Sequence, residues 1–196
     1  YSPAPVVTPD VHARVMREVI NPTLAGMAAE GLPYTGFLYA GLMIDGEGKP
    51  RVVEFNCRMG DPETQPIMMR LKTDLADLIE AAIAGQLDQT EAEWDRRFAL
   101  GVVLAAAGYP ENPHKGDVIT GLPTGEHDDV HVFHAGTAAK DGQIVTAGGR
   151  VLCVTALGDN VRSAQKRAYE VADGIVFEGR QYRRDIGHRA IGRKTT

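Results

Sequence analysis

The spacing of apolar residues in the first part of the chain predicts a helix followed by a hairpin. Thr8, Pro9 and Asp10 form a helix start, because a capping hydroxyl precedes a proline and an acid. Apolar residues at near-helical spacing follow, and the proline at 22 predicts a kink before an end near Gly31. The apolar run 36–44 predicts a buried strand, and residues 51–57 predict its antiparallel return strand.

Two further helices are predicted after the hairpin, over residues 64–71 and 74–84. The second carries an apolar stripe at helical spacing, made of Leu75, Leu78, Ile79 and Ala82. The polar stretch 85–91 then predicts a domain boundary.

The second half has a different pattern, with short apolar runs separated by glycine, proline, asparagine and aspartate. These runs predict strands over residues 98–107, 117–122, 130–135, 143–146 and 150–156, and Asn160 caps a helix predicted over 161–172. We therefore predict the α+β class: an antiparallel hairpin with helices over residues 1–90, then a small, mainly antiparallel β domain with one helix over residues 91–196.

Composition and charge narrow the class of protein. The 196 residues are 43% hydrophobic and 24% charged, without a long apolar span or a signal peptide, and the two cysteines favour a reducing cytoplasm over a disulfide framework. Net charge is −5, yet residues 180–194 hold six basic side chains against Asp185 alone. We expect this segment to be solvated or packed on acidic neighbours, because no aromatic platform for nucleic acid accompanies it. The start of the chain, without an initiator Met, suggests a fragment.

Residues 52–65 carry the candidate chemistry. Glu54 and Asn56 alternate on a strand and so share one face, where their oxygens suit a hard cation such as Mg²⁺. Arg58 follows and could hold a phosphate, while Asp61 and Glu63 add carboxylates nearby. A loop of structural salt bridges is the alternative. Cys57 is expected to be a small buried strand residue and not a nucleophile.

Other residues and motifs give weaker evidence for a functional site. His131 and His134 lie three apart in a predicted strand, so they should face opposite sides and make a poor metal pair. The chain has neither a nucleophile elbow nor a Walker loop, so it holds little of its own to bind a nucleotide.

The motif R-M-G-D-P-E-T-Q at residues 58–65 resembles the R-[LF]-G-D-P-E segment of the phosphoribosylamine–glycine ligase family, which belongs to the ATP-grasp superfamily. Residues 34–42, 116–119, 149–152 and 184–187 are also similar to that family. Met59 stands where the family usually has Phe or Leu, a change that conserves volume. The resemblance implies the C-terminal half of an ATP-grasp domain followed by the family's C-terminal domain.

The resemblance also implies a reaction. The family uses ATP to phosphorylate the carboxylate of glycine, and the amine of 5-phosphoribosylamine attacks the glycyl phosphate to give glycinamide ribonucleotide, ADP and phosphate. Glu54 and Asn56 match the family's Mg²⁺ or Mn²⁺ ligands, and Arg58 would stabilise the transferring phosphoryl group. We infer that Asp61 and Glu63 hold an ammonium or amine group of a substrate.

The expected partners are therefore small molecules, together with the missing N-terminal part of the same enzyme, and neither nucleic acid nor membrane. Without that part the chain is expected to be inactive. Two alternatives remain: another ATP-grasp carboxylate–amine ligase, and a stand-alone binding module without turnover.

Overall fold

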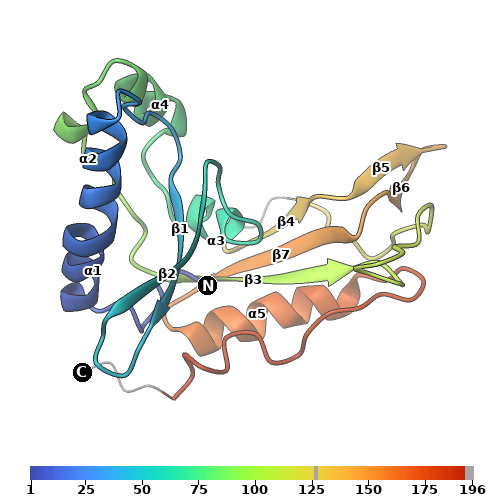
Figure 1. Cartoon of the computed structure of the whole chain (residues 1–196). Coiled ribbons are helices and arrows are strands. Elements are labelled where there is room, and N and C mark those ends of the chain that lie inside the picture. Colours follow the sequence, from blue (N-terminus) through green and yellow to red (C-terminus); the bar gives the residue numbers. More distant parts are fainter. Residues whose placement is uncertain (126–127, 193–196) are drawn as a thin grey trace. The chain divides into compact units, whose positions relative to one another are not determined.

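The structure is a computed structural model that describes residues 1–125 and 128–192. The chain forms two compact units that interleave in sequence (Figure 1). We call Pro3–Asp61 with Leu71–Trp94 the hairpin unit, and we call Tyr1–Ser2, Pro62–Arg70 and the described chain from Asp95 onward the sheet unit. Mixed helices and antiparallel strands confirm the predicted α+β class.

The hairpin unit begins with a long helical stretch, as predicted. It comprises α1 (Pro9–Val15), a π-helical segment (Met16–Ile20) and α2 (Asn21–Ala29). Thr8 caps the start, because its Oγ1 accepts a hydrogen bond from the Val11 backbone N–H at 3.3 Å. The π-helical segment ends at Ile20, just before Asn21 and Pro22, and this proline has no backbone N–H to donate, so regular α-helical hydrogen bonding changes where the sequence predicted an irregularity.

The predicted hairpin is present as β1 (Tyr39–Ile44) and β2 (Pro50–Asn56), which pair antiparallel. Its register shifts once: Gly41 lies opposite Glu54 but Leu42 lies opposite Val52, so Val53 is an extra bulged residue. The prediction of a buried strand is wrong, since β1 is only partly covered and β2 is mostly exposed. Among the described residues the hairpin is a two-stranded sheet, so it has no neighbouring strand to extend its cover.

The remaining helix of the hairpin unit is α4 (Leu75–Ile83), followed by a 3₁₀ turn (Leu87–Gln89). Asp74 caps α4, since its Oδ1 accepts from the Ala76 N–H at 2.8 Å.

The sheet unit contains a three-stranded antiparallel sheet in the order β3–β7–β4. These strands are β3 (Phe98–Ala105), β4 (Val130–His134) and β7 (Arg150–Gly158), and β5 (Thr137–Lys140) with β6 (Gln143–Thr146) forms a separate hairpin. The strand predicted over residues 117–122 is wrong. That segment makes only single bridges, from Val118 to β6 and from Thr120 to Val176, so no ladder forms.

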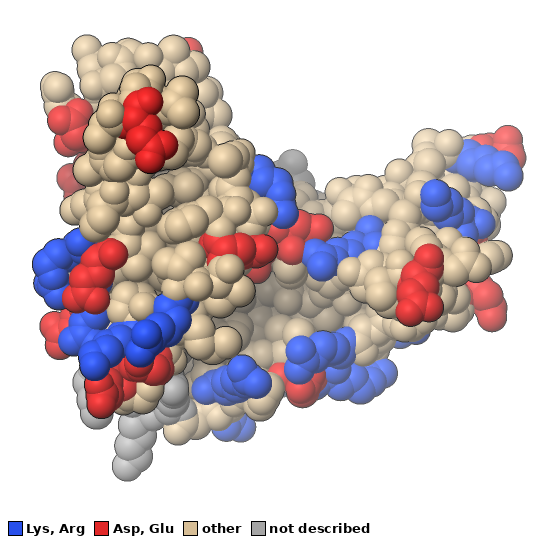
Figure 2. Space-filling model, in the orientation of Figure 1, with Lys and Arg blue, Asp and Glu red and all other residues tan. Residues whose placement is uncertain are grey.

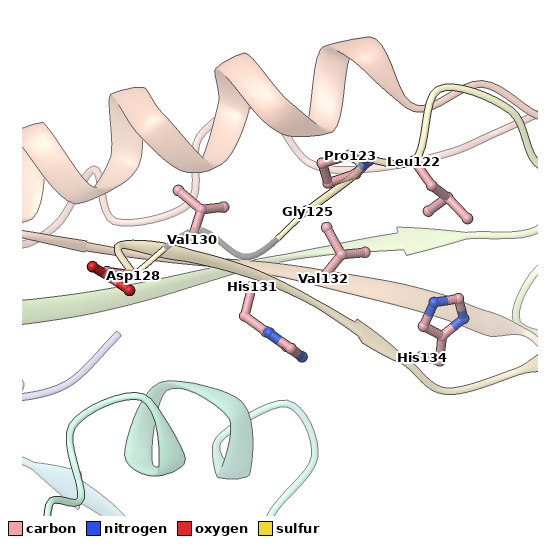
Figure 3. Close-up of a pocket in the computed structure, with 8 residues that line it drawn as sticks. All are labelled: Leu122, Pro123, Gly125, Asp128, Val130, His131, Val132 and His134. Carbon is pink, nitrogen blue, oxygen red and sulfur yellow. The ribbon is translucent and has the colours of Figure 1, made fainter.

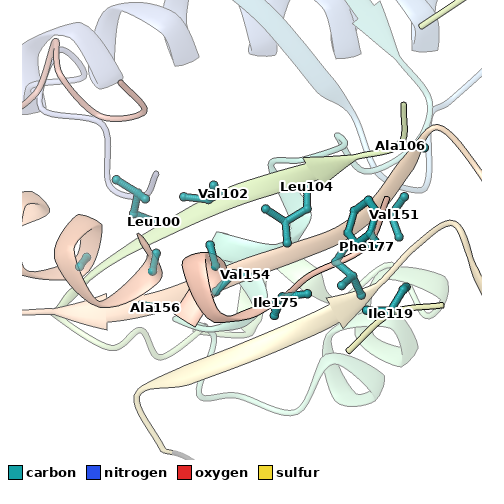
Figure 4. Close-up of a cluster of buried hydrophobic side chains, with 14 of the residues drawn as sticks. Leu100, Val102, Leu104, Ala106, Ile119, Val151, Val154, Ala156, Ile175 and Phe177 are labelled. Carbon is teal, nitrogen blue, oxygen red and sulfur yellow. The ribbon is translucent and has the colours of Figure 1, made fainter. Parts of the chain in front are cut away.

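One face of this sheet is covered by α5 (Val161–Gly174), which begins at a capping box of Asn160 and Ser163. Small residues on the inner side of the helix, Ala164, Ala168 and Ala172, are fully buried against the sheet. Figure 4 shows this core, with Leu100, Val102, Leu104, Val154 and Ala156 from the strands and Ile175 and Phe177 from the chain after α5. Burial of these side chains supplies the main stabilising term of the unit.

The short helix α3 (Thr64–Met68) joins the sheet unit through two anchors. A Cβ at Gly101 of β3 would lie 3.5 Å from Pro66 of α3. The helix therefore packs closely on the strand at a position that has no side chain. Arg70 then donates to the carbonyls of Asp95 at 3.1 Å and Arg97 at 2.9 Å. In the described part of the chain, no helix is both long and apolar enough to cross a bilayer.

Candidate functional site

The predicted metal ligands lie on β2 as the sequence requires. Glu54 pairs with Gly41 and Asn56 pairs with Tyr39, so these four residues alternate with their neighbours onto one face of the hairpin. Glu54 is exposed and Asn56 is half-buried. The bulge at Val53 lies just before this pair, so it does not disturb the alternation from Glu54 to Asn56.

Arg58 lies directly against Asn56. Its Nη2 donates to Asn56 Oδ1 at 3.2 Å and its Nη1 donates to the Met59 carbonyl at 3.0 Å. The guanidinium is exposed, so its outer face is open to an anionic ligand. The structure thus brings together three of the five residues expected to form the site.

The two other acids lie in the stretch of sequence where the chain passes from the hairpin unit to the sheet unit. Asp61 ends one segment of the hairpin unit, and Glu63 belongs to the sheet unit immediately before α3. Both residues are exposed. Their assignment to substrate binding therefore stays a prediction.

The donor set fits a hard divalent cation. Glu54 offers carboxylate oxygens and Asn56 an amide oxygen, whereas a softer metal would call for sulfur or imidazole ligands. Within residues 1–125 and 128–192, no three His, Cys, Asp or Glu side chains cluster into a metal site. The pair thus suits an ion such as Mg²⁺ that keeps phosphates and waters as its other ligands.

Of two residues beside the site, Tyr34 was not identified from the sequence and the environment of Cys57 was predicted wrongly. Cys57 is exposed after the end of β2, so the expectation of a buried strand residue is wrong. The Tyr34 hydroxyl lies near Cys57 and donates to the Phe37 carbonyl at 2.7 Å. Desolvation, and then the contact with Cys57, raise the pKa of Tyr34. The only sequence signal for Tyr34 was its position just before the apolar run 36–44.

A groove of about 410 Å³ runs beside β4 in the sheet unit (Figure 3). Val130 and Val132 point to one side of the strand and His131 to the other. His131 stacks edge-on against Phe133, with ring centroids 4.5 Å apart, whereas His134 Nδ1 lies 3.0 Å from Thr137 Oγ1. The two histidines thus have separate partners.

The basic segment near the end of the chain is packed on acidic and carbonyl groups, as one interpretation of the sequence predicted. Arg183 pairs with Asp185 at 2.7 Å, Arg184 pairs with Asp173 at 3.4 Å, and Arg180 donates to the Ala172 carbonyl at 2.6 Å. Figure 2 shows acidic side chains beside most of the basic ones on the face in view. The last two basic residues of the segment, Arg193 and Lys194, lie outside the described residues.

Comparison with protein families gives two matches, one in each half of the chain. Residues 1–64 match the ATP-grasp (A) domain of phosphoribosylglycinamide synthetase, and residues 99–189 match the C domain of the same enzyme. The second match covers the β3–β7–β4 sheet and α5, and the first includes the hairpin with Glu54, Asn56 and Arg58.

Curated relatives carry the name phosphoribosylamine–glycine ligase. The chain is 64% identical to that of Ralstonia nicotianae, over 98% of its own length and 46% of the relative. It is 66% identical to that of Vibrio cholerae, over 99% of its own length and 45% of the relative. The chain thus spans less than half the length of the curated relatives that it matches.

Solved structures agree. The phosphoribosylamine–glycine ligase of Thermotoga maritima aligns with a TM-score of 0.80 and 41% identity, over 91% of this chain and 44% of that one. A biotin carboxylase domain from Hydrogenobacter thermophilus aligns over 92% of this chain and 39% of its own, with a TM-score of 0.61 but only 15% identity, so it shares the fold alone. The matches to both domains and the high identity along the whole chain show that this chain belongs to the phosphoribosylamine–glycine ligase family.

Proposed function

We propose that this chain is the C-terminal portion of an enzyme that joins glycine to 5-phosphoribosylamine. In this reaction the γ-phosphoryl group of ATP passes to the carboxylate of glycine and ADP leaves. The amine of 5-phosphoribosylamine then attacks the acyl carbon, and phosphate leaves as the amide bond of glycinamide ribonucleotide forms. The observation that carries the proposal is the 64–66% identity to ligases of this name along 98–99% of the chain.

Glu54 and Asn56 would hold a Mg²⁺ or Mn²⁺ ion in this enzyme. Their shared face on β2 and their oxygen donors support the assignment. A bound divalent ion there would neutralise phosphate charge during transfer.

Arg58 would bind the transferring phosphoryl group or the acyl phosphate. Its planar fork is exposed beside Asn56, so it can donate two hydrogen bonds to phosphate oxygens while the amine approaches the carbon. Its fixed positive charge stabilises negative charge that builds up on the phosphoryl oxygens.

Asp61 and Glu63 would attract the ammonium group of glycine or the amine of 5-phosphoribosylamine. Their exposure leaves the carboxylates accessible to a ligand, and their negative charge attracts a cation. These two assignments rest on the motif and on charge.

The ATP-dependent activity would need the rest of the enzyme, because the chain has no phosphate-binding loop of its own. We place the enzyme in the cytoplasm, with small molecules as its partners and without nucleic acid or membrane. We also propose that the family domains divide near residue 90, as 1–90 and 91–196.

The test is ADP formation by the full-length protein. We expect release of ADP that requires both glycine and 5-phosphoribosylamine, and its loss in Glu54→Gln at ordinary Mg²⁺. Release supported by another carboxylate–amine pair, but not by this one, would reject the substrate assignment. The separate 196-residue chain should release no ADP under the same conditions.

A further inference from the structure

Gly41 leaves an open position on the face of the hairpin that carries the predicted metal ligands. It lies directly opposite Glu54, and Tyr39, two residues earlier, lies opposite Asn56. A Cβ placed on Gly41 would lie 3.0 Å from Glu54 Cγ and 3.5 Å from Tyr39 Cε1. The stem of Glu54 and the ring of Tyr39 therefore both border the space that a side chain at 41 would fill.

The backbone does not require glycine at this position. Gly41 is absent from the twelve glycines with positive φ, so an L-residue could adopt its conformation without strain. Glycine in a strand also weakens it, because it offers no side chain to pack. The absence of a Cβ next to Glu54 is then the feature that distinguishes this glycine.

We propose that Gly41 is a positioning residue for the metal site. The missing side chain lets the stem of Glu54 lie flat across β1, and the Tyr39 ring bounds the other side of the same space. This contact fixes the direction in which the Glu54 carboxylate projects, so that it acts together with Asn56 on one cation. The proposal rests on the proposed function, because it takes Glu54 as a ligand.

The physical reason is the narrow geometry that a divalent cation accepts. A contact at 3.0 Å is tighter than nearly all real Cβ contacts, so an alanine at 41 would push the Glu54 stem aside by a few tenths of an ångström or into another rotamer. Glu54 is exposed, so it can move without unfolding the hairpin. The cost should therefore appear in cation affinity and not in stability.

The experiment measures Mn²⁺ affinity of the full-length protein in the presence of a non-hydrolysable ATP analogue, by electron paramagnetic resonance and without turnover. We expect Gly41→Ala to weaken binding by about 10- to 100-fold, the range seen when groups that orient metal ligands are changed. Gly46→Ala is the matched control: it lies in the turn of the same hairpin, has no heavy atom within 4 Å of its Cβ position, and should bind as the unmodified protein does. Unchanged affinity in Gly41→Ala would overturn the proposal.

A double-mutant cycle separates positioning from general distortion. In a Glu54→Gln background, the titration extends to Mn²⁺ concentrations that saturate that variant. There, adding Gly41→Ala should weaken Mn²⁺ binding at least about fivefold less than it does in the unmodified protein, because substitutions of contacting residues are coupled. If Gly41→Ala weakens Mn²⁺ binding equally in both backgrounds, the alanine distorts the hairpin generally and the proposal is wrong. If Glu54→Gln alone binds Mn²⁺ normally, the ligand assignment in the proposed function fails instead.

Discussion

Arg58 donates a hydrogen bond from Nη2 to Oδ1 of Asn56, with the two atoms 3.2 Å apart. The same amide oxygen is the predicted metal ligand, so a guanidinium and a divalent cation would share it. Two positive charges a few ångströms apart repel by several kcal/mol near a protein surface. A phosphate between them removes this conflict, since it can bind the metal and the arginine together. Arg58 and the cation should therefore compete without nucleotide and cooperate with it.

Arg58→Ala should show both effects in the full-length protein. We expect kcat to fall by about 10²- to 10³-fold, as for loss of one group that stabilises developing charge. Affinity for Mn²⁺ alone should stay the same or rise, because a competing positive charge has gone. Steady-state kinetics and a Mn²⁺ titration without nucleotide measure the two quantities. A weaker affinity for Mn²⁺ alone would show that Arg58 supports the metal ligands and does not compete with the ion.

The turn of the hairpin predicts a dependence on pH. Asp45 Oδ1 accepts from the backbone N–H groups of Lys49 at 2.9 Å and Glu47 at 3.0 Å, and the Lys49 bond is the main cause that lowers the pKa of Asp45. Because the folded pKa is lowered, the stabilisation is present above the ordinary value of 3.8 and is lost as pH falls through the folded pKa. Asp45→Ala should thus increase hydrogen exchange of the β1–β2 turn at neutral pH.

The matched measurement for Asp45 is the same exchange experiment repeated in acid. The difference between Asp45→Ala and the unmodified protein should shrink there, since the carboxyl is then protonated in both states. Asp45→Asn keeps an acceptor oxygen without the charge, so its exchange should lie between the two. A difference that does not depend on pH would assign the stability of the turn to packing alone.

The hairpin shows what a sequence can and cannot predict. Its turn chemistry and two apolar runs were sufficient to place the strands, because these signals act over a few residues. Burial of β1 could not be predicted, since cover depends on which other segment packs on the hairpin. The register shift at Val53 was also invisible, because it depends on pairing across strands.

The candidate site divides in the same way. Alternation along one strand was enough to place Glu54 and Asn56 on one face. The position of Gly41 opposite Glu54 could not be predicted, because it depends on the pairing with the other strand. The phosphate role of Arg58 was inferred from its guanidinium at the end of the strand, and the family motif then narrowed it to the transferring phosphoryl group. The segment 117–122 was wrongly predicted as a strand, because its two bridges reach two different partners. Such long-range pairing cannot be predicted from local composition.

The core of the sheet unit should depend strongly on Leu100 of β3. Its side chain is fully buried against α5, and removing such a group leaves a cavity. Leu100→Ala should lower the free energy of unfolding by about 2–5 kcal/mol. Val176, which is 55% exposed in the same unit, is the control, and Val176→Ala should change the free energy by less than about 0.5 kcal/mol. Urea denaturation followed by circular dichroism measures both, and equal losses would contradict this location of the core.

Two glycines in the sheet unit should respond oppositely to alanine. A Cβ on Gly158, at the end of β7, would lie 2.4 Å from the Ala164 backbone nitrogen and 2.5 Å from Ser163 Oγ. The first turn of α5 would have to move, and with it the capping box, so Gly158→Ala should destabilise the unit by about 1–3 kcal/mol. Gly174, the last residue of α5, has no heavy atom within 4 Å of its Cβ position and its φ is not positive.

Gly174→Ala should therefore be neutral or stabilise the unit by about 0.4–1 kcal/mol, because alanine has fewer conformations to lose on folding. Hydrogen exchange of α5 peptides, measured by mass spectrometry, resolves both changes: exchange should accelerate in Gly158→Ala and stay level or slow in Gly174→Ala. If both variants accelerate exchange equally, helix α5 is sensitive to any added methyl group and the close approach of Gly158 to Ala164 is not the cause. A slower exchange in Gly158→Ala would reject the close approach itself.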